Sequence, residues 1–404
     1  MVFLIARSHG TSKALFCRPT SRHEESDIFK SSTSRSSATD TGGSNVSSRS
    51  SIVASLIIVV VVFGSVGGIL YVTSPYEPSR IAVVVMDPGF GDLSYADQLY
   101  TGLTRLLSYI SVQYYIPSYP KTQTEAVTTL RELAQSGRYS LILAMGRDLV
   151  PSVQTVADEF PEQKFAMIDG YVSGNNVVSA TFKVEQAAFV AGVFAALMAA
   201  NITQKVGIIG SVQSDTGVQA MISGFIQGVT TANETYDLGV TLLDTVYIGS
   251  YNNTELAAQY TTTMFLSQDA SIIFAPVRAS MLGVRQGMEV VNKTMFASLN
   301  RMPLVIAAEG DQDYYGNPNP HVAIGPSWIP MSVVPRTDLA AFRIINATMW
   351  NNFPGGQTFE YDLANGGVNV TNFTFSSTYV PLSIQRRVWE YAAAVAEGTI
   401  TVEP

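Results

Sequence analysis

The sequence predicts an α/β protein of two similar lobes, preceded by one transmembrane helix. Short apolar runs and amphipathic stretches alternate after residue 80, at about 30 residues per β-α-β unit. The same rhythm begins again after residues 176–182, so two lobes of one kind are expected. Residues 51–72 form a run of twenty-two residues without a charged side chain. Such a run is long enough to cross a hydrocarbon core of roughly 30 Å.

Residues 1–50 differ in composition from the rest of the chain. They are rich in Ser, Thr and Arg, and they hold seven Lys and Arg against four Asp and Glu, a net charge of +3. Because the whole chain has a formal charge of −8, the remaining residues carry −11. A segment with so little apolar periodicity cannot bury enough surface to offset its ordering entropy. We therefore expect a disordered leader.

The charges beside residues 51–72 predict the orientation of this segment. Arg35 and Arg49 precede it, whereas Glu77 and then Arg80 follow it. By the positive-inside rule the leader is cytoplasmic, residues 73–79 are a linker, and the body is the extracellular part of a single-pass protein of the cell membrane. A cleaved signal peptide is the alternative, because small residues lie near the end of the run, at Gly64, Ser65, Gly67 and Gly68.

Composition excludes several kinds of function. An acidic chain, with a pI of about 5.0, argues against nucleic-acid binding. The single cysteine, Cys17, lies in the leader, so the body has no intramolecular disulfide, cysteine zinc site or thiol nucleophile. His321 is the only histidine of the body, which argues against a metal site of several histidines and disfavours a Ser/His/Asp triad. We expect a monomer without metal or cofactor.

Asn-x-Ser/Thr sequons beyond the anchor are consistent with an exported glycoprotein. They begin at Asn201, Asn233, Asn252, Asn292, Asn346, Asn369 and Asn372.

The predicted elements follow the order strand, helix, strand through both lobes. In the first half, strands are expected at 80–86, 112–116, 139–145, 165–168 and 176–182, and helices at 94–109, 122–135 and 150–159. In the second half, strands are expected at 206–209, 242–247, 271–274, 304–308 and 322–324, and helices at 185–200, 217–231, 253–267, 280–291 and 331–350. We assign 80–180 plus about 300–328 to lobe 1, and 181–299 plus about 329–404 to lobe 2.

Two α/β lobes outside a membrane indicate a cleft that closes on a small molecule by hinge motion. Ligands of parallel sheets bind where the strands end, and polar residues follow several of the predicted strands. The candidate binding residues are Asp87, Asp92, Ser94, Tyr95, Gly146, Asp169, Phe274, Arg278, Glu309, Asp311 and Trp328.

Each candidate also has a structural interpretation. Asp92 or Ser94 can cap the following helix, and Asp169 can form an Asx-type turn. Glu309 and Asp311 offer acceptors for sugar hydroxyls or form a solvated turn. Phe274, Arg278 and Trp328 supply an aromatic face or a cation to a ligand, or are structural.

The sequence around Gly89 and Gly91 begins a dinucleotide-type glycine pattern but does not complete it. Ser94 takes the position of the third glycine, and two acidic residues nearby would repel a pyrophosphate at the helix N-terminus.

A series of motifs along the body carries a family resemblance. It includes D-L-S-Y at 92–95, F-x-x-I-D-G at 165–170, N-V-x-S-x-x-F at 176–182 before an Ala-rich helix, V-G-x-I-G at 206–210, the E-G-D-Q run at 309–312, Gly-Gly-Val at 366–368 and a closing helix with a G-x-I-x-V tail. In order and spacing these resemble the basic membrane protein family of ABC-transporter substrate-binding proteins, whose better-known members bind purine nucleosides. The resemblance covers about residues 80–404.

The resemblance implies a type I periplasmic-binding-protein fold, with two Rossmann-like lobes joined by a hinge. It implies that a base stacks on Tyr95 and on an aromatic residue of the second lobe. Asp87, Asp92 and Asp169 would make polar contacts, and Glu309 would face the ribose. Ala96 replaces the family's asparagine, and Pro330 stands where a lysine is expected, so the ligand's identity stays open.

Three functions are compatible with these features. The leading hypothesis is a membrane-anchored, non-enzymatic receptor that delivers a nucleoside, expected to be a purine, to an ABC permease and its ATPase; a sugar-like solute is the alternative ligand. The second is a ligand sensor of the same fold. The third is a nucleoside hydrolase using Asp87, Asp92 and Asp169 as a carboxylate cluster.

Overall fold

The computed structural model describes residues 79–319 and 326–404, which fall in the compact unit formed by 76–404. The predicted leader, the uncharged run at 51–72 and nearly all of the linker lie outside the described residues, as does the predicted strand at 322–324. Within the described ranges, no helix has both the length and the apolar character needed to cross a bilayer.

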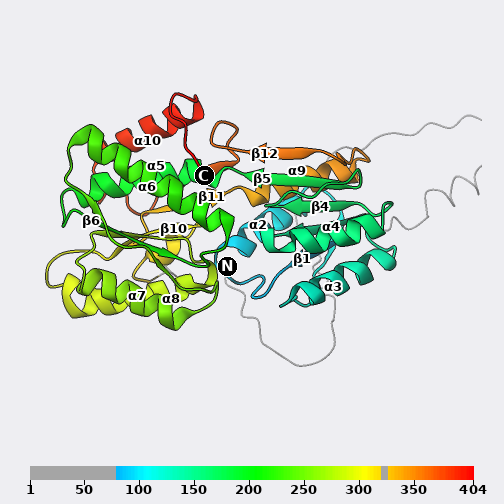
Figure 1. The fold of residues 1–404 in the computed structure, drawn as a ribbon, viewed down its shortest axis with the longest axis horizontal. Helices are drawn as coiled ribbons and strands as arrows, with labels where there is room; N and C mark the ends of the chain where they lie inside the picture. The colour runs from blue at the N-terminus through cyan, green and yellow to red at the C-terminus, as the bar shows by residue number, and fades with distance from the viewer. Residues whose placement is uncertain (1–78, 320–325) are drawn as a thin grey trace, which may run out of the picture. The chain divides into compact units, whose positions relative to one another are not determined.

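The first of two sheets is parallel throughout (Figure 1). Its order is β12 (Thr358–Tyr361), β5 (Val177–Phe182), β4 (Phe165–Ile168), β3 (Leu141–Met145), β1 (Ser79–Val85) and β2 (Val112–Tyr115). The central strands are fully buried apolar runs, as parallel strands covered on both faces require. Helices α2 (Tyr95–Leu106) and α9 (Thr337–Met349) cover one face, and α3 (Gln123–Gln135) and α4 (Val150–Glu159) cover the other.

The second sheet repeats this design with one antiparallel edge. Its order is β13 (Val368–Val370), β11 (Met331–Pro335), β10 (Leu304–Ala308), β9 (Ile272–Ala275), β6 (Lys205–Gly210) and β7 (Thr241–Leu242), with β8 (Val246–Tyr247) also paired to β6. Helices α5 (Val184–Ala199), α6 (Thr216–Tyr236) and α10 (Leu382–Ala396) cover one face. Helices α7 (Thr254–Leu266) and α8 (Met281–Val291) cover the other.

Both sheets share the strand order 2-1-3-4-5, counted within each lobe. This order places a topological switch point between β1 and β3 in the first lobe, and between β6 and β9 in the second. Ligands of doubly wound sheets bind beyond the carboxyl ends of the strands at this point. The loops after these four strands therefore define where a site is expected.

Helix α5 is the most deeply buried helix segment of the second lobe. All of its residues except Gln186 are buried, which is why its sequence is apolar on every side. Glycines let it approach α6 closely. A Cβ on Gly192 would lie 2.1 Å from the Phe225 carbonyl oxygen, and one on Gly228 would lie 2.0 Å from that of Phe189.

The chain passes between the sheets three times, and these passages lie side by side. The first contains Lys183, the second Arg336, and the third residues 362–367. The Lys183 amide donates to the Tyr361 carbonyl at 2.8 Å, and the Arg336 amide donates to the Gly367 carbonyl at 2.8 Å.

The strand pairing corrects the predicted lobe boundaries. Strand β10 pairs with β9 in the second sheet, so the segment around Leu304–Ala308 belongs to lobe 2, not lobe 1. Helix α9 packs against α2, and β12 pairs with β5, so both belong to lobe 1, not lobe 2. Strand β10 is the fourth strand of the 2-1-3-4-5 order in the second sheet. A short apolar run predicts a buried strand but does not show which sheet the strand joins, so the sequence could not place this boundary.

Two element predictions also need correction. The predicted helix at 331–350 begins with a strand, because Met331–Pro335 pairs with β10 and only Thr337–Met349 is helical. Pro335, which cannot donate a backbone hydrogen bond, ends the strand. The predicted strand at 242–247 is two short pieces, β7 and β8. The other predicted strands and helices that fall in the described ranges are present, with ends shifted by a few residues.

Candidate functional site

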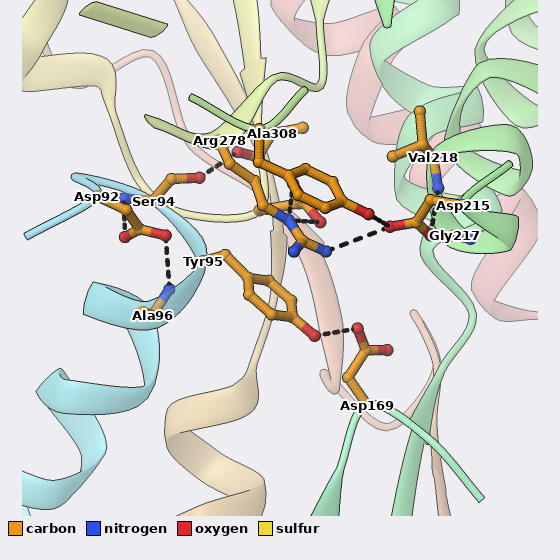
Figure 2. A network of polar contacts seen from close by, with 12 residues as sticks. Asp92, Ser94, Tyr95, Ala96, Asp169, Asp215, Gly217, Val218, Arg278 and Ala308 are labelled. Carbon is orange, nitrogen blue, oxygen red and sulfur yellow. Dashed lines mark hydrogen bonds and ion pairs between the residues drawn. The ribbon is translucent and has the colours of Figure 1, made fainter. Parts of the chain in front are cut away.

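The segment after β1 brings four of the predicted residues to the switch point: Asp87, Asp92, Ser94 and Tyr95. Asp92 lies two residues before the N-cap residue of α2, and its carboxylate accepts from the backbone amides of Ser94 at 2.9 Å and Ala96 at 3.0 Å (Figure 2). This confirms the capping interpretation for Asp92. The Ser94 hydroxyl instead donates to the Ala308 carbonyl at 3.0 Å, a hydrogen bond between the two lobes. Tyr95 then begins the helix with a buried ring.

Arg147 connects carboxylates of both lobes. It follows Gly146 at the end of β3, and its Nη1 lies 2.5 Å from an Asp169 oxygen. Its Nε donates to Asp215 of the second lobe at 3.0 Å. The side chain crosses directly over Gly217, where a Cβ would lie 1.9 Å from the guanidinium. A glycine in the first turn of α6 is therefore needed for this ion pair.

Arg278 is the centre of the second-lobe part of the site. It is 8% exposed and follows β9, and its Nε lies 3.1 Å from both carboxylate oxygens of Glu309. Its Nη2 donates to Asp215 at 3.4 Å (Figure 2). The guanidinium carbon lies 4.0 Å from the ring centre of Tyr95 and 4.1 Å from that of Tyr251, one ring from each lobe.

Hydrogen bonds hold the two tyrosines in place. The Tyr95 hydroxyl donates to Asp169 in the same lobe (Figure 2). The Tyr251 hydroxyl donates to Asp215 at 2.6 Å. Both rings are thus fixed by carboxylates that also bind an arginine.

The titration behaviour of the carboxylates follows from burial and from these arginines. Burial by itself would raise the pKa of Asp215, but Arg147 and Arg278 together lower it to about 2. Burial raises the pKa of Glu309, and Arg278 opposes that rise. Burial also raises the pKa of Asp92, although backbone amides at the start of α2 favour its charged form.

Little free volume remains between these groups. A cavity of about 30 Å³ is bounded by residues that include Asp87, Asp92, Tyr95, Tyr251 and Arg278. Pockets for small organic ligands usually measure about 300–1,000 Å³. In this conformation the space beside Tyr95, Tyr251 and Arg278 is therefore too small to hold a molecule of nucleoside size.

The structure brings most of the predicted residues together but not all. Asp87, Asp92, Tyr95, Arg278 and, through Arg278, Glu309 surround the cavity or its walls, with Asp169 one contact away. Gly146 lies beside them with a φ of 120°, and its Cα faces the Asp148 carboxylate.

Three predicted residues lie elsewhere. Phe274 is fully buried and stacks on Phe225 at 4.4 Å, because its side of β9 faces α5 and α6. Trp328 belongs to the core under α7 and α8. The exposed Asp311 accepts from the Asp313 amide at 3.2 Å and so forms a turn. In this structure these three residues have structural roles, in the core or in a turn, and do not line the cavity.

Arg147, Asp148, Asp215 and Tyr251 are part of the site but were absent from the predicted set. Arg147 and Tyr251 follow strands of the two lobes, so the rule that sites lie beyond carboxyl ends could have found them. Asp215 is the N-cap of α6, and nothing in its local sequence signals contact with an arginine from the other lobe.

These carboxylates surround arginines. Among the residues that the structure describes, no group of three or more His, Cys, Asp or Glu side chains is placed to hold a metal ion.

The fold is that of two-lobed solute-binding proteins. A crystal structure of an ABC transporter solute-binding protein from Aeropyrum pernix K1 aligns with a TM-score of 0.70 at 21% identity, over 81% of this chain and 94% of the other. A transcriptional activator of the comK gene from Bacillus halodurans shares the fold, with a TM-score of 0.61 at 19% identity, over 80% of this chain and 99% of the other. At these identities the likeness concerns the fold alone.

Sequence comparison gives the family. The Bmp family model, described as ABC transporter substrate-binding protein PnrA-like, matches residues 79–388, and the chain belongs to this family. An uncharacterized lipoprotein of Pyrococcus furiosus is 28% identical over 79% of this chain and 76% of its own length. The ABC transporter nucleoside-binding protein BmpA of Lactococcus lactis is 28% identical over 68% of this chain and 74% of its own length.

Proposed function

We propose that this protein is the extracytoplasmic solute-binding component of an ABC importer, and that it captures a nucleoside, with a purine as the preferred base, in the cleft between its lobes. The main support for this proposal is that Tyr95 and Tyr251 present rings from opposite lobes to one site at the switch points of both sheets. Family membership and the nucleoside-binding Lactococcus lactis relative support the same class of ligand.

The polar groups of the site suit the rest of a nucleoside. Asp87 and Asp92 at one wall of the cavity offer acceptors for base or ribose donors. Glu309, behind Arg278, is the acceptor nearest the end of β10 and faces the ribose in this proposal. Closure of the lobes on the solute would occur at the three adjacent passages between the sheets.

Delivery needs a membrane-bound permease with its ATPase, and residues 51–72 would keep the receptor beside it. In this proposal the protein makes and breaks no covalent bond. Binding and release of an unchanged solute are its whole activity.

Calorimetric titration of the full chain in detergent tests the proposal, after unfolding and refolding to remove carried-over solute. Purine and pyrimidine nucleosides, free bases and simple sugars are titrated in parallel. We expect micromolar or tighter binding of a purine nucleoside that chromatography recovers intact. A folded sample that binds no nucleoside contradicts the proposed ligand, and cleavage of the nucleoside contradicts the receptor.

The ring of Tyr95 has a matched control in the same lobe. Tyr95→Ala should weaken nucleoside binding about fivefold or more, since stacking on one base contributes about 1–3 kcal/mol. Tyr171, which is 61% exposed outside the cavity, should tolerate the same change without loss of affinity.

A further inference from the structure

The position of Arg278 raises the question of where a ligand ring can lie. Its guanidinium fills the space between the Tyr95 and Tyr251 rings, at 4.0 and 4.1 Å from their centres. A planar base needs a comparable gap between two faces. Either the ligand displaces Arg278, or the lobes separate and the ligand stacks on the guanidinium itself.

The contacts of Arg278 decide between these two possibilities. The polar contacts that hold its guanidinium come from the second lobe: Glu309 accepts from Nε at 3.1 Å, and Asp215 accepts from Nη2 at 3.4 Å. The Tyr251 ring beneath it also belongs to this lobe and is fixed by Asp215. From the first lobe the Tyr95 ring contacts it, through the opposite face of the guanidinium.

Displacement would leave a buried carboxylate poorly compensated. Glu309 is 1% exposed, and with Arg278 gone its nearest described cation is Arg147, whose Nη2 lies 3.9 Å away. Removing one partner of a buried ion pair is strongly destabilising, because Glu309 has almost no solvent contact and, among the described cations, would keep only the longer contact to Arg147. Separation of the lobes breaks the Arg147–Asp215 ion pair, but it leaves the Arg278–Glu309–Asp215 contacts intact and frees one face of the Arg278 guanidinium.

We propose that the ligand ring stacks between the Tyr95 ring and the Arg278 guanidinium, so that Arg278, lying flat on Tyr251, is the second-lobe stacking surface and favours neutral over positively charged rings. Guanidinium groups stack well on electron-rich aromatic faces. A cationic ring would meet a like charge at stacking distance, while Asp215 and Glu309 already bind an arginine. This inference rests on the proposed function, since it assigns the place of the base.

The test compares guanosine with 7-methylguanosine, whose imidazole ring is positively charged below neutral pH. Both are titrated calorimetrically into the full chain and into Arg278→Gln. In Arg278→Gln we expect weaker guanosine binding and at least a tenfold drop in the preference for guanosine over 7-methylguanosine, because Asp215 and Glu309 then attract the cation. The steric effect of the methyl group is the same in both variants, so it cancels when their guanosine-to-7-methylguanosine affinity ratios are compared.

Two further variants separate charge from folding. Arg278→Lys keeps the charge without the planar face, so it should retain the preference for the neutral ring while binding guanosine more weakly. The double variant Arg278→Gln/Glu309→Gln removes the unpaired carboxylate, and its thermal unfolding shows whether the single variant is folded. In the double variant the guanosine preference should again be lower than in the natural chain.

Several results would overturn the inference. Tighter guanosine binding by folded Arg278→Gln would show that Arg278 blocks the ring's place. An unchanged preference between the two nucleosides, with binding intact, would show that Arg278 does not contact the ring. Neither result touches the proposed function, whereas absence of binding by the natural chain overturns both.

Discussion

Arg147 donates through Nε to Asp215 at 3.0 Å, and this ion pair joins the two lobes directly. The same guanidinium binds Asp169 within its own lobe. One side chain thus couples the wall of the first lobe to the helix cap of the second, because Asp215 also accepts from the Gly217 amide at 2.8 Å.

Arg147→Gln should loosen the lobes and destabilise the protein. It leaves the largely buried Asp169 without its cation and Asp215 with Arg278 alone, so the free energy of unfolding should fall by up to about 3 kcal/mol. Small-angle X-ray scattering of the solute-free protein should give a larger radius of gyration. The matched control is Arg131→Gln, which breaks an exposed ion pair with Glu159 and should leave both quantities unchanged. Equal radii for Arg147→Gln and the natural chain would contradict the interlobe role.

Tyr95→Phe separates the ring of Tyr95 from its hydroxyl. The variant loses the hydrogen bond to Asp169 but keeps the stacking face. We expect nucleoside affinity within a few fold of the natural chain, and a melting temperature lowered by the loss of a charge-assisted hydrogen bond of about 1.5–3 kcal/mol. Calorimetry and thermal unfolding measure the two effects. A loss of affinity as large as that of Tyr95→Ala would show that the hydroxyl, not the ring, recognises the solute.

Asp313 predicts a pH dependence of stability. It is 3% exposed, and burial together with Asp311 raises its pKa from 3.8 to about 7. Between about pH 4 and 7, the folded protein keeps a proton on Asp313 that the unfolded chain has already released. The free energy of unfolding therefore falls as the pH rises through this window. The contribution lost by pH 8 is on the order of 4 kcal/mol at most.

Asp313→Asn should remove this contribution. The amide stays neutral and its oxygen can still accept from the Ser332 hydroxyl, which lies 2.7 Å from the natural carboxylate. Melting temperatures at pH 5 and pH 8 should differ less in the variant than in the natural chain. Asp158→Asn, at an exposed position that does not contribute to the pKa of Asp313, is the control and should retain the natural difference. An identical pH profile for Asp313→Asn would contradict a proton held at this side chain.

Gly228→Ala tests the close approach of α5 and α6. Alanine is favoured over glycine in a helix by about 1 kcal/mol, yet here its Cβ would lie 2.0 Å from the Phe189 carbonyl oxygen. Because that oxygen belongs to a buried helix backbone, we expect a net destabilisation of about 2 kcal/mol or more. Thr230→Ala, on the exposed side of the same helix, should be neutral or slightly stabilising. A more stable Gly228→Ala variant would show that the helices can move apart freely.

The chain's local patterns predict many elements of both lobes and part of the site. The strand Phe165–Ile168 and the strand Leu304–Ala308 have the bounds that their apolar runs predict, because a strand buried on both faces must be apolar throughout. The sequence predicts that Asp92 or Ser94 can cap the following helix, and the Asp92 carboxylate does so, because capping is a local interaction. The prediction that the helix begins at Met331 was wrong, because a short apolar run before a helix has no periodicity to distinguish it from the helix.

The sequence by itself determined the family, the alternation of strands and helices, and the presence of Tyr95, Arg278 and Glu309 near strand ends. These follow from periodicity, turn residues and motif order, all of which are local. Only the tertiary structure decided that β10 belongs to the second sheet and that Phe274 faces the core. It alone placed Arg278 between two tyrosines and Arg147 against Asp215, since these contacts join segments from both lobes whose proximity depends on how the two sheets meet.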